Sequence, residues 1–479
     1  MTKLKENKEV IIASFFIIFV AYSIKLFSYS YSIDTEIYMV QKLEMLKSWL
    51  AIHRFSLVAM KYLTNWIPFY LPLINWLTIL LFWISNLFAY FNLSQISPKL
   101  KNKKIAIFFV SVISTSPIFL EQFNFTLQSM EIAFFLNLFE CSVFFLIKYT
   151  RNFKYRYALL TILLLTCCIG CYQSFVSLFI TMSMIIDWCL IENQITKEKN
   201  RKYIFSTILI LLISLSLYFL LGDIILSYFQ LSSSGYLQSQ IGWRSGTIVT
   251  CFLNILKSAV RSYFGFLFHM PSFSVLNAFL LLFAFLLMVK QLKQKQYFKT
   301  LLILGVITSP ILMSIVLGNP EPIRACLSLP FTLAFLLWIT YQEKKWYRYL
   351  ITVLVIIQML TMLRFEYYDL KRYQNDVAMA QQIYEKVKDY THDHALVFVG
   401  SKDSSMNQKM IKGEVMGYSF FDYDGLSNRA VTFMESLGLH VYGDLNFVQE
   451  AEIILKNYPS YPAESSILIT EKHILIKLS

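Results

Sequence analysis

The sequence predicts an all-α polytopic membrane protein with a small C-terminal α/β domain. Two features of composition point this way: the 479-residue chain is 56% hydrophobic, and only 15% of its residues are charged. A third is that the apolar residues gather in runs long enough to cross a bilayer. Soluble domains carry roughly 25% charged residues, so this composition is not that of a soluble domain.

We expect about eleven membrane-spanning helices from these runs. The lysine-bearing start MTKLKENK leads into the first run without a small-residue cleavage pattern, so this run should remain as an anchored span. The runs lie at roughly 9–27, 71–92, 105–120, 127–148, 157–170, 173–191, 203–222, 273–290, 300–317, 324–341 and 349–364.

Lys and Arg residues predict the orientation of these spans. Basic links follow the second, fourth, sixth, eighth and tenth runs, among them KLKNKK and KEKNRK. Short links rich in Lys and Arg stay on the cytoplasmic side. We therefore expect a multi-pass protein of a bacterial cell membrane with a cytoplasmic N-terminus and an extracytoplasmic C-terminus. The outer links are then 28–70, the turn around EQFNF, 223–272 and the turn GNPEPIR.

The charge distribution divides the chain near residue 364. Residues 1–364 carry about 32 Lys and Arg against 14 Asp and Glu, whereas residues 365–479 carry about 11 against 16. The net charge of +13 therefore follows the cytoplasmic links and does not indicate nucleic acid binding. The tail combines a helical pattern in DVAMAQQIYEKVKDY, strand-like runs in ALVFVG and SILITEKHILIKL, and turn signals at DYDG and LSNR.

Asp34 and Glu36 are the first candidates for catalysis. They stand among aromatic residues in FSYSYSIDTEIYM, directly after the first apolar run. A carboxylate in an aromatic, partly desolvated setting can have its pKa raised toward neutrality, which suits a general base that removes a proton from a sugar hydroxyl. The alternative is that both are solvated caps of the helix predicted to follow.

Arginines in the outer links are candidates for binding a phosphate, because a planar guanidinium can hold two oxygens at once. Arg54 lies in IHRF, Arg244 in GWRSG and Arg324 in GNPEPIR. Arg324 stands against the usual cytoplasmic bias of Lys and Arg, which favours a functional role. For Arg54 the alternative is a side chain that snorkels to the lipid headgroups.

Further polar residues at the outer ends of the predicted spans are candidates for substrate binding. Glu131 lies one turn into an otherwise apolar span, so it should face the protein interior and have a partner. Gln128, three residues earlier, shares its helix face. A purely structural polar network is an equal alternative. The candidates are Glu121, Gln122, Gln128, Glu131, Tyr172 and Gln173.

No cofactor is identified from the sequence. The chain has no G-x-G-x-x-G after a strand and no P-loop, so no nucleotide-binding fingerprint is visible. No cluster of metal-ligating residues stands out from the scattered acids, and dependence on a divalent metal stays open.

Several of these segments resemble the glucosyltransferase II family of bacterial membrane proteins, which is related to the serotype-converting glucosyltransferases of O-antigen modification. The resemblance rests on YSIDTEIYM, SWLAIHRFSLVAMKYL, EQFNFTLQSMEIAFF, CIGCYQSF and GNPEPIRACLSLPF. It implies a glycosyltransferase of the GT-C type in residues 1–364, followed by an extracytoplasmic α/β domain in residues 365–479. Family members often carry a paired-acid motif in the first outer loop. Here the acids are separated, as D-T-E, which leaves open whether Asp34 or Glu36 is the base.

The resemblance also implies the substrates. The donor would be a sugar linked to polyprenyl phosphate on the outer face of the bilayer, and the acceptor a cell-surface polysaccharide. The sugar would be a hexose, with glucose as the implied one. Two other functions use similar substrates: a flippase for lipid-linked oligosaccharides and a polysaccharide polymerase. A flippase would be expected to show two similar halves or charged residues spread along its spans, and the sequence shows neither.

Overall fold

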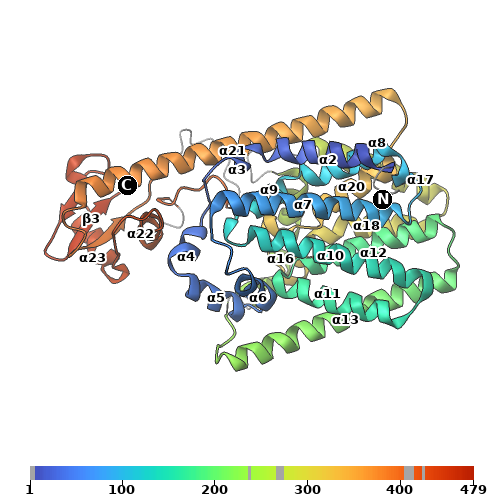
Figure 1. Cartoon of the computed structure of the whole chain (residues 1–479), viewed down its shortest axis with the longest axis horizontal. Coiled ribbons are helices and arrows are strands. Elements are labelled where there is room, and N and C mark those ends of the chain that lie inside the picture. Colours follow the sequence, from blue (N-terminus) through green and yellow to red (C-terminus); the bar gives the residue numbers. More distant parts are fainter. Residues whose placement is uncertain (1–5, 236–238, 266–274, 404–414, 423–426) are drawn as a thin grey trace. The chain divides into compact units, whose positions relative to one another are not determined.

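The computed structural model describes residues 6–235, 239–265, 275–403, 415–422 and 427–479 (Figure 1). The chain divides into two compact units, which are described separately below. A helical unit comprises Met1–Leu26, Leu46–Phe123 and Gln128–Leu363. A second unit comprises Phe27–Met45, Asn124–Leu127 and Arg364–Ser479.

Capping side chains and glycines determine where several helices of the first unit begin and end. Asn102, Thr196 and Thr247 precede helices and accept hydrogen bonds from backbone N–H groups in the first turn, at 3.0, 3.4 and 3.2 Å. Gly265 and Gly318 end helices with φ of 60° and 70°, a conformation that glycine adopts without strain. The unit is built from α2 (Lys8–Ala21), α3 (Ser23–Leu26), α6 (Phe55–Leu63), α7 (Leu71–Ser94), η1 (Lys99–Lys101), α8 (Lys103–Ser114), α9 (Pro117–Asn124), α10 (Thr126–Asn152), α11 (Tyr155–Cys171), α12 (Phe175–Glu192), α13 (Lys197–Tyr228), α15 (Gly242–Ser245), α16 (Ile248–Phe264), α17 (Val275–Lys293), α18 (Tyr297–Thr308), η4 (Ser309–Ile311), α19 (Leu312–Leu317), η5 (Ile323–Ala325) and α20 (Leu329–Thr340).

Two helices have substantial parts in both units. Some other helices extend by only a few residues from one unit into the other. The shared helices are α5 (Lys42–Ala51) and α21 (Lys345–Val387). The second unit is otherwise built from α4 (Thr35–Val40), β1 (Ala395–Val399), α22 (Ser427–Ser436), η7 (Leu445–Phe447), α23 (Val448–Ile454), η8 (Glu464–Ser466), β2 (Ile467–Ile469) and β3 (His473–Lys477).

Eight helices of the described residues are long and apolar enough to cross a membrane. They correspond to the predicted runs that begin at residues 71, 105, 127, 173, 203, 273, 300 and 349. The runs 157–170 and 324–341 form the shorter apolar helices α11 and α20, and the run 9–27 is divided between α2 and α3. The structure therefore supports a mostly helical membrane protein, while the number eleven is not confirmed.

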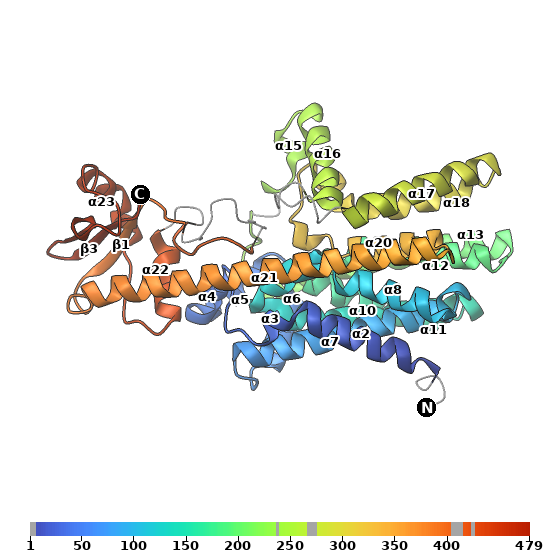
Figure 2. The same ribbon diagram turned by 90° about the horizontal axis from the view of Figure 1, so that it is seen from above.

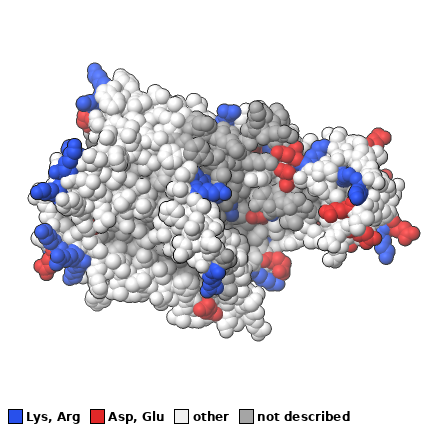
Figure 3. Space-filling view, turned by 180° about the vertical axis from the view of Figure 1, so that it is seen from behind, with Lys and Arg blue, Asp and Glu red and all other residues white. Residues whose placement is uncertain are grey.

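The core of the helical unit lies around α8 and α20. Every residue of α20 is buried, and α8 packs against α2, α7 and α20. In contrast, α13 leaves large apolar side chains such as Phe205 (70% exposed) uncovered by protein. Such a surface is stable only against lipid. Figure 3 shows one face of this unit almost without charged side chains, with Lys and Arg gathered along its edge.

The link predicted at 223–272 contains more regular structure than expected. Helix α13 extends into it as far as Tyr228, and α15 and α16 follow. Helix α15 packs on the turn after α19, since Trp243 donates to the Ile315 carbonyl at 3.0 Å and the Asn319 amide donates to the Gln240 carbonyl at 2.9 Å. In Figure 2 α17 and α18 run side by side beyond this segment.

The tail contains a three-stranded sheet in the order β1-β3-β2. Strand β1 pairs in parallel with β3, with Ala395 opposite His473, and β2 pairs with β3 in antiparallel fashion. The strand-like runs ALVFVG and SILITEKHILIKL are thus confirmed, and the helical pattern in DVAMAQQIYEKVKDY is the end of α21. The turn expected at LSNR is wrong, because α22 begins at Ser427. Most of DYDG and the first five residues lie outside the described residues.

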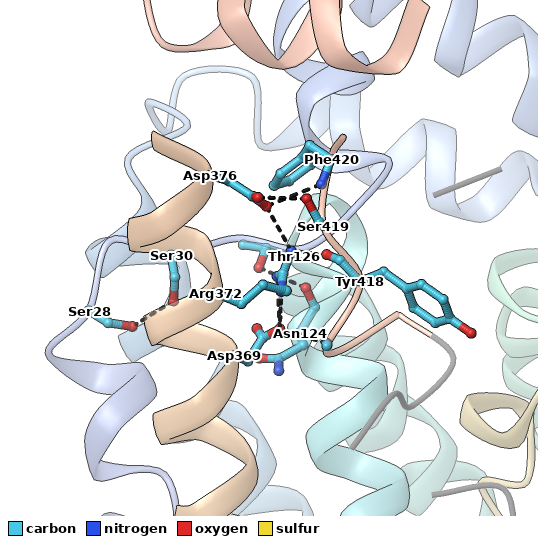
Figure 4. A network of polar contacts seen from close by, with 11 residues as sticks. Ser28, Ser30, Asn124, Thr126, Asp369, Arg372, Asp376, Tyr418, Ser419 and Phe420 are labelled. Carbon is cyan, nitrogen blue, oxygen red and sulfur yellow. Dashed lines mark hydrogen bonds and ion pairs between the residues drawn. The ribbon is translucent and has the colours of Figure 1, made fainter. Parts of the chain in front are cut away.

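A buried arginine ties residues 417–420 to α21 in the second unit (Figure 4). Arg372, which is 1% exposed, donates to Asp369 at 2.8 Å and to Asp376 at 3.3 Å. The same carboxylates accept hydrogen bonds from the backbone of Gly417 at 2.8 Å and of Phe420 at 3.1 Å. Because each buried charge has opposite charges and further donors around it, the network can be stable without water.

Candidate functional site

Asp34 and Glu36 both bind the guanidinium of Arg429, within the second unit. Arg429 Nη2 lies 2.8 Å from Asp34 Oδ1, and Arg429 Nη1 lies 2.6 Å from Glu36 Oε1. The Glu36 side chain is fully buried, whereas the Asp34 side chain is 32% exposed. Two carboxylates therefore share one cation, and the group as a whole carries one excess negative charge when both acids are ionised.

The backbone at Asp34 explains how both carboxylates reach one guanidinium. Side chains two residues apart on a regular helix point in different directions. Asp34, however, precedes α4 with φ of 69°, in the left-handed region. Its side chain does not cap α4 by a hydrogen bond, and Glu36 in the first turn is buried. The interpretation of both acids as solvated helix caps is therefore not what the structure shows.

Burial raises the pKa of Glu36 to about 7. The positive charge of Arg429 acts in the opposite direction, and the negative charge of Asp34 raises the pKa further. Glu36 Oε2 has no hydrogen-bond partner within the part of the chain that the structure describes. Glu36 can therefore hold a proton near neutral pH and release it again, which is the property that a general base requires.

Aromatic side chains hold α22, and with it Arg429, against the segment that carries the acids. Phe433 of α22 stacks on Phe420, with ring centroids 4.0 Å apart. The backbone N–H of Phe420 belongs to the Arg372 network. The Tyr31 ring packs edge to face on both phenylalanines, at 5.6 and 6.2 Å, and its hydroxyl lies 2.6 Å from Ser436 Oγ. Tyr31 thus has a structural role: it fixes the acid-bearing segment beside α22.

A second polar cluster lies within the helical unit. Arg54 Nη1 donates to Gln128 Oε1 at 3.3 Å, and the Arg54 guanidinium lies 4.8 Å from the centre of the Tyr172 ring. Lys61 Nζ lies 2.9 Å from Glu131 Oε1, and both side chains are buried. The partner expected for Glu131 is thus Lys61. Since α6 supplies Arg54 at its N-cap and Lys61 near its end, this short helix positions both cations against α10.

The remaining substrate-binding candidates also lie in the helical unit, where Glu121 and Gln122 are buried and Gln173 is half-buried. Gln173 donates to the Ile52 carbonyl at 2.8 Å and to the Tyr218 hydroxyl at 3.0 Å. Gln122 is fully buried, and neither side-chain polar atom has a hydrogen-bond partner among the described residues. Glu121, beside it on α9, is 2% exposed. Buried amide groups without partners are costly, so the Gln122 side chain is a natural place for a polar ligand group.

The other two predicted phosphate ligands lie on short elements. Arg244 is exposed on α15, and Arg324 is half-buried on η5. The hydrogen bond from the Asn319 amide to the Gln240 carbonyl, just before α15, brings the segment that carries Arg244 close to the turn that leads to Arg324. Among the described residues no group of three or more His, Cys, Asp or Glu side chains is arranged to hold a metal.

Sequence reasoning missed Arg429 and Lys61. Lys61 could have been found, because a buried Glu131 requires a cation and Lys61 lies in the same outer link as Arg54. Arg429 could not, because nothing in LSNR distinguishes it from a surface arginine and its partners are about four hundred positions away in the sequence.

The family model described as glucosyl transferase GtrII matches residues 23–341. The matched region contains the acid pair and the Arg54 cluster, whereas Arg429 lies beyond it. No curated protein and no solved structure matches the chain.

Proposed function

The chain belongs to the glucosyl transferase GtrII family, and we propose that it transfers a hexose, with glucose as the expected one, from a polyprenyl-phosphate donor to a cell-surface polysaccharide. The reaction takes place on the outer face of a bacterial membrane, in a GT-C-like transmembrane domain of residues 1–364. Residues 365–479 form an extracytoplasmic domain that supplies Arg429 to the acid pair.

The acid pair is the observation that carries this proposal. Glu36 is buried and has a pKa of about 7, and it lies beside a second carboxylate on a segment outside the candidate spans. Carboxylates in such a setting serve proton transfer, and a general base contributes about 10²–10⁴-fold to rate. Because Asp34 and Glu36 share one cation, replacing both acids tests the proposal whichever of the two takes the proton.

The proposed step is a direct displacement at the anomeric carbon. The acceptor hydroxyl oxygen forms a bond to this carbon, and the bond from the carbon to the phosphate oxygen breaks. The acid pair takes the hydroxyl proton, and the electron pair of the broken bond leaves on polyprenyl phosphate. Arg54 and Arg324, with Arg244, stabilise the departing phosphate, and Glu121, Gln122, Gln128, Glu131, Tyr172 and Gln173 contact the substrates.

The choice of donor follows from the proposed side of the membrane. The basic links Lys99–Lys101 and Lys197–Arg201 are assigned to the cytoplasm, which leaves the acid pair outside. Nucleotide sugars are absent there, so a sugar carried by a lipid phosphate is the natural donor. The glucosyltransferase family assignment is consistent with this reaction.

The test is transfer in isolated membranes with radiolabelled polyprenyl-phosphate-glucose and the host's own surface polysaccharide. Wild type is compared with the Asp34→Asn/Glu36→Gln double variant. A matched control is Glu450→Gln/Glu452→Gln, which removes two exposed acids with the same spacing on α23. We expect label in the polysaccharide for wild type and control, and at least about a hundredfold less for the double variant.

The outcomes separate the candidate functions. Near-normal transfer by the Asp34→Asn/Glu36→Gln variant would show that the acids are not the base. Uptake of the labelled lipid into vesicles without any sugar transfer would favour the flippase, and chain lengthening of a lipid-linked polysaccharide would favour the polymerase.

A further inference from the structure

An apolar groove lies between α12, α13 and α18, away from both clusters described above. Its volume is about 340 Å³, and its walls include Phe179, Leu211 and Leu301. Pockets of about 300–1,000 Å³ are large enough for small-molecule ligands. The groove opens on the apolar outer surface of α13, where Ile208 is 54% exposed.

A basic pocket of about 730 Å³ continues from this groove. Ile204 and Phe298 line both, so groove and pocket are contiguous. The basic pocket is formed by the first turns of α13 and α18 and by the link before α18. Its cations are Lys197, Arg201, Lys295 and Lys299.

The cations of the basic pocket lack acidic counterparts. All residues that line it belong to the described part of the chain, and none of them is Asp or Glu. The comparable pocket near the start of α2 differs, because Glu6 lines it beside Lys101 and Lys103. Four positive charges in a lining that contains no carboxylate favour an anionic ligand.

Asp187 lies where the apolar groove adjoins the basic pocket. Its side chain lines the apolar groove, is 3% exposed, and interacts with Asn200, which lines the basic pocket. Asp187 Oδ1 has no hydrogen-bond partner among the described residues. An ionisable group at such a position in an apolar helix is usually kept for a functional reason.

We propose that this groove and pocket together bind an anionic phospholipid, with the phosphate among Lys197, Arg201, Lys295 and Lys299 and an acyl chain against α12, α13 and α18. A free phosphate would use the cations but not the groove, and an uncharged lipid would use the groove but not the cations. Phospholipid is the occupant that satisfies both, and it is present wherever these helices cross a bilayer. The inference does not depend on the proposed sugar transfer.

The test measures binding of phosphatidylglycerol to the purified full-length protein in detergent, by native mass spectrometry and by the shift in thermal stability. Each Lys or Arg near an anionic lipid surface contributes about fivefold in affinity. The Lys197→Gln/Arg201→Gln/Lys299→Gln variant should therefore bind at least about tenfold more weakly. The matched control, Lys104→Gln/Lys344→Gln/Lys345→Gln, removes three exposed cations that do not line this site.

A second variant tests the groove without changing charge. Ile204→Trp places a large side chain where the groove meets the basic pocket, and it should also weaken binding. Wild type should bind phosphatidylglycerol in preference to phosphatidylcholine, and glycerol phosphate should not compete. Equal binding of both lipids, equal loss in the control variant, or full competition by glycerol phosphate would each overturn the proposal.

Discussion

Replacing Arg429 tests whether this residue sets the proton affinity of the acid pair. Arg429→Gln leaves Glu36 buried beside Asp34. Among the described residues, it removes the only cation that forms ion pairs with both acids. The positive charge of Arg429 holds the pKa of Glu36 below the value that burial alone would give, so its removal must raise that pKa above about 7.

The size of the effect follows from the pKa of Glu36. The rise from the ordinary value of 4.5 to about 7 corresponds to about 3 kcal/mol of free energy of unfolding. The sign is that of a group with a raised pKa: this contribution of Glu36 is fully present below pH 4.5 and is lost as pH rises through about 7. In Arg429→Gln the loss continues to higher pH. A first further pKa unit lowers the ionised fraction of Glu36 at pH 7 about fivefold, from about one half, and each unit beyond it about tenfold.

The assay is the rate of sugar transfer in isolated membranes between about pH 6 and 9. For wild type the rate should rise with pH through about 7, because the pair must be ionised to accept a proton. Arg429→Gln should show the same rise at higher pH, with transfer at pH 7 reduced about fivefold or more and recovered in part at pH 9. Arg429→Lys, which keeps the charge but not the two-pronged geometry, should lie between them.

The reasoning would be refuted if the transfer rate of Arg429→Gln were lower than that of wild type at every pH but rose through the same pH. Arg429 would then hold the fold together without setting proton affinity. Lys456→Gln, an exposed change in the same unit, serves as the control for handling and expression.

Two further predictions concern stability. Arg372→Gln should destabilise the tail by about 3–5 kcal/mol, because it leaves Asp369 and Asp376 buried without their cation. Limited proteolysis of the variant should then cut near residues 417–420. A variant as resistant to the protease as wild type would contradict this prediction. Lys61→Met should destabilise the helical unit by a similar amount of about 3–5 kcal/mol, because Glu131 is left buried and unpaired. Adding Glu131→Gln should restore much of that loss in a thermal-stability assay, and strictly additive losses would argue against the pair.

Much of the fold could be predicted from the sequence because apolar runs and β-branched strands are local signals. The eight long apolar helices and the strands of the tail follow from such runs. The sequence predicts spans at α11 and α20 as well, but both are shorter than the eight long apolar helices, since a buried helix in a large bundle need not match the bilayer in length. Helix α22 was missed because Ser427 and Asn428 occur equally in turns and at helix starts.

The candidate site was only half accessible to sequence reasoning. Asp34, Glu36 and Arg54 could be proposed because charge beside an apolar run is costly and therefore informative. Their partners could not be paired, since pairing depends on contacts between distant segments. Two examples are the pairs Arg54–Gln128 and Glu36–Arg429. In each, only the structure identifies which side chain is the partner.

The position of Arg429 bears on how the tail should be understood. The acid pair lies within residues 23–341, the region that the family model matches, and Arg429 lies beyond it. A buried Glu36 beside Asp34 is unstable as two negative charges unless a cation is near, because desolvation and mutual repulsion act in the same direction. The cation comes from α22, which is held by Phe420, Phe433 and the Arg372 network. The tail is therefore part of the candidate active site, since its Arg429 opposes the rise that burial gives to the pKa of Glu36.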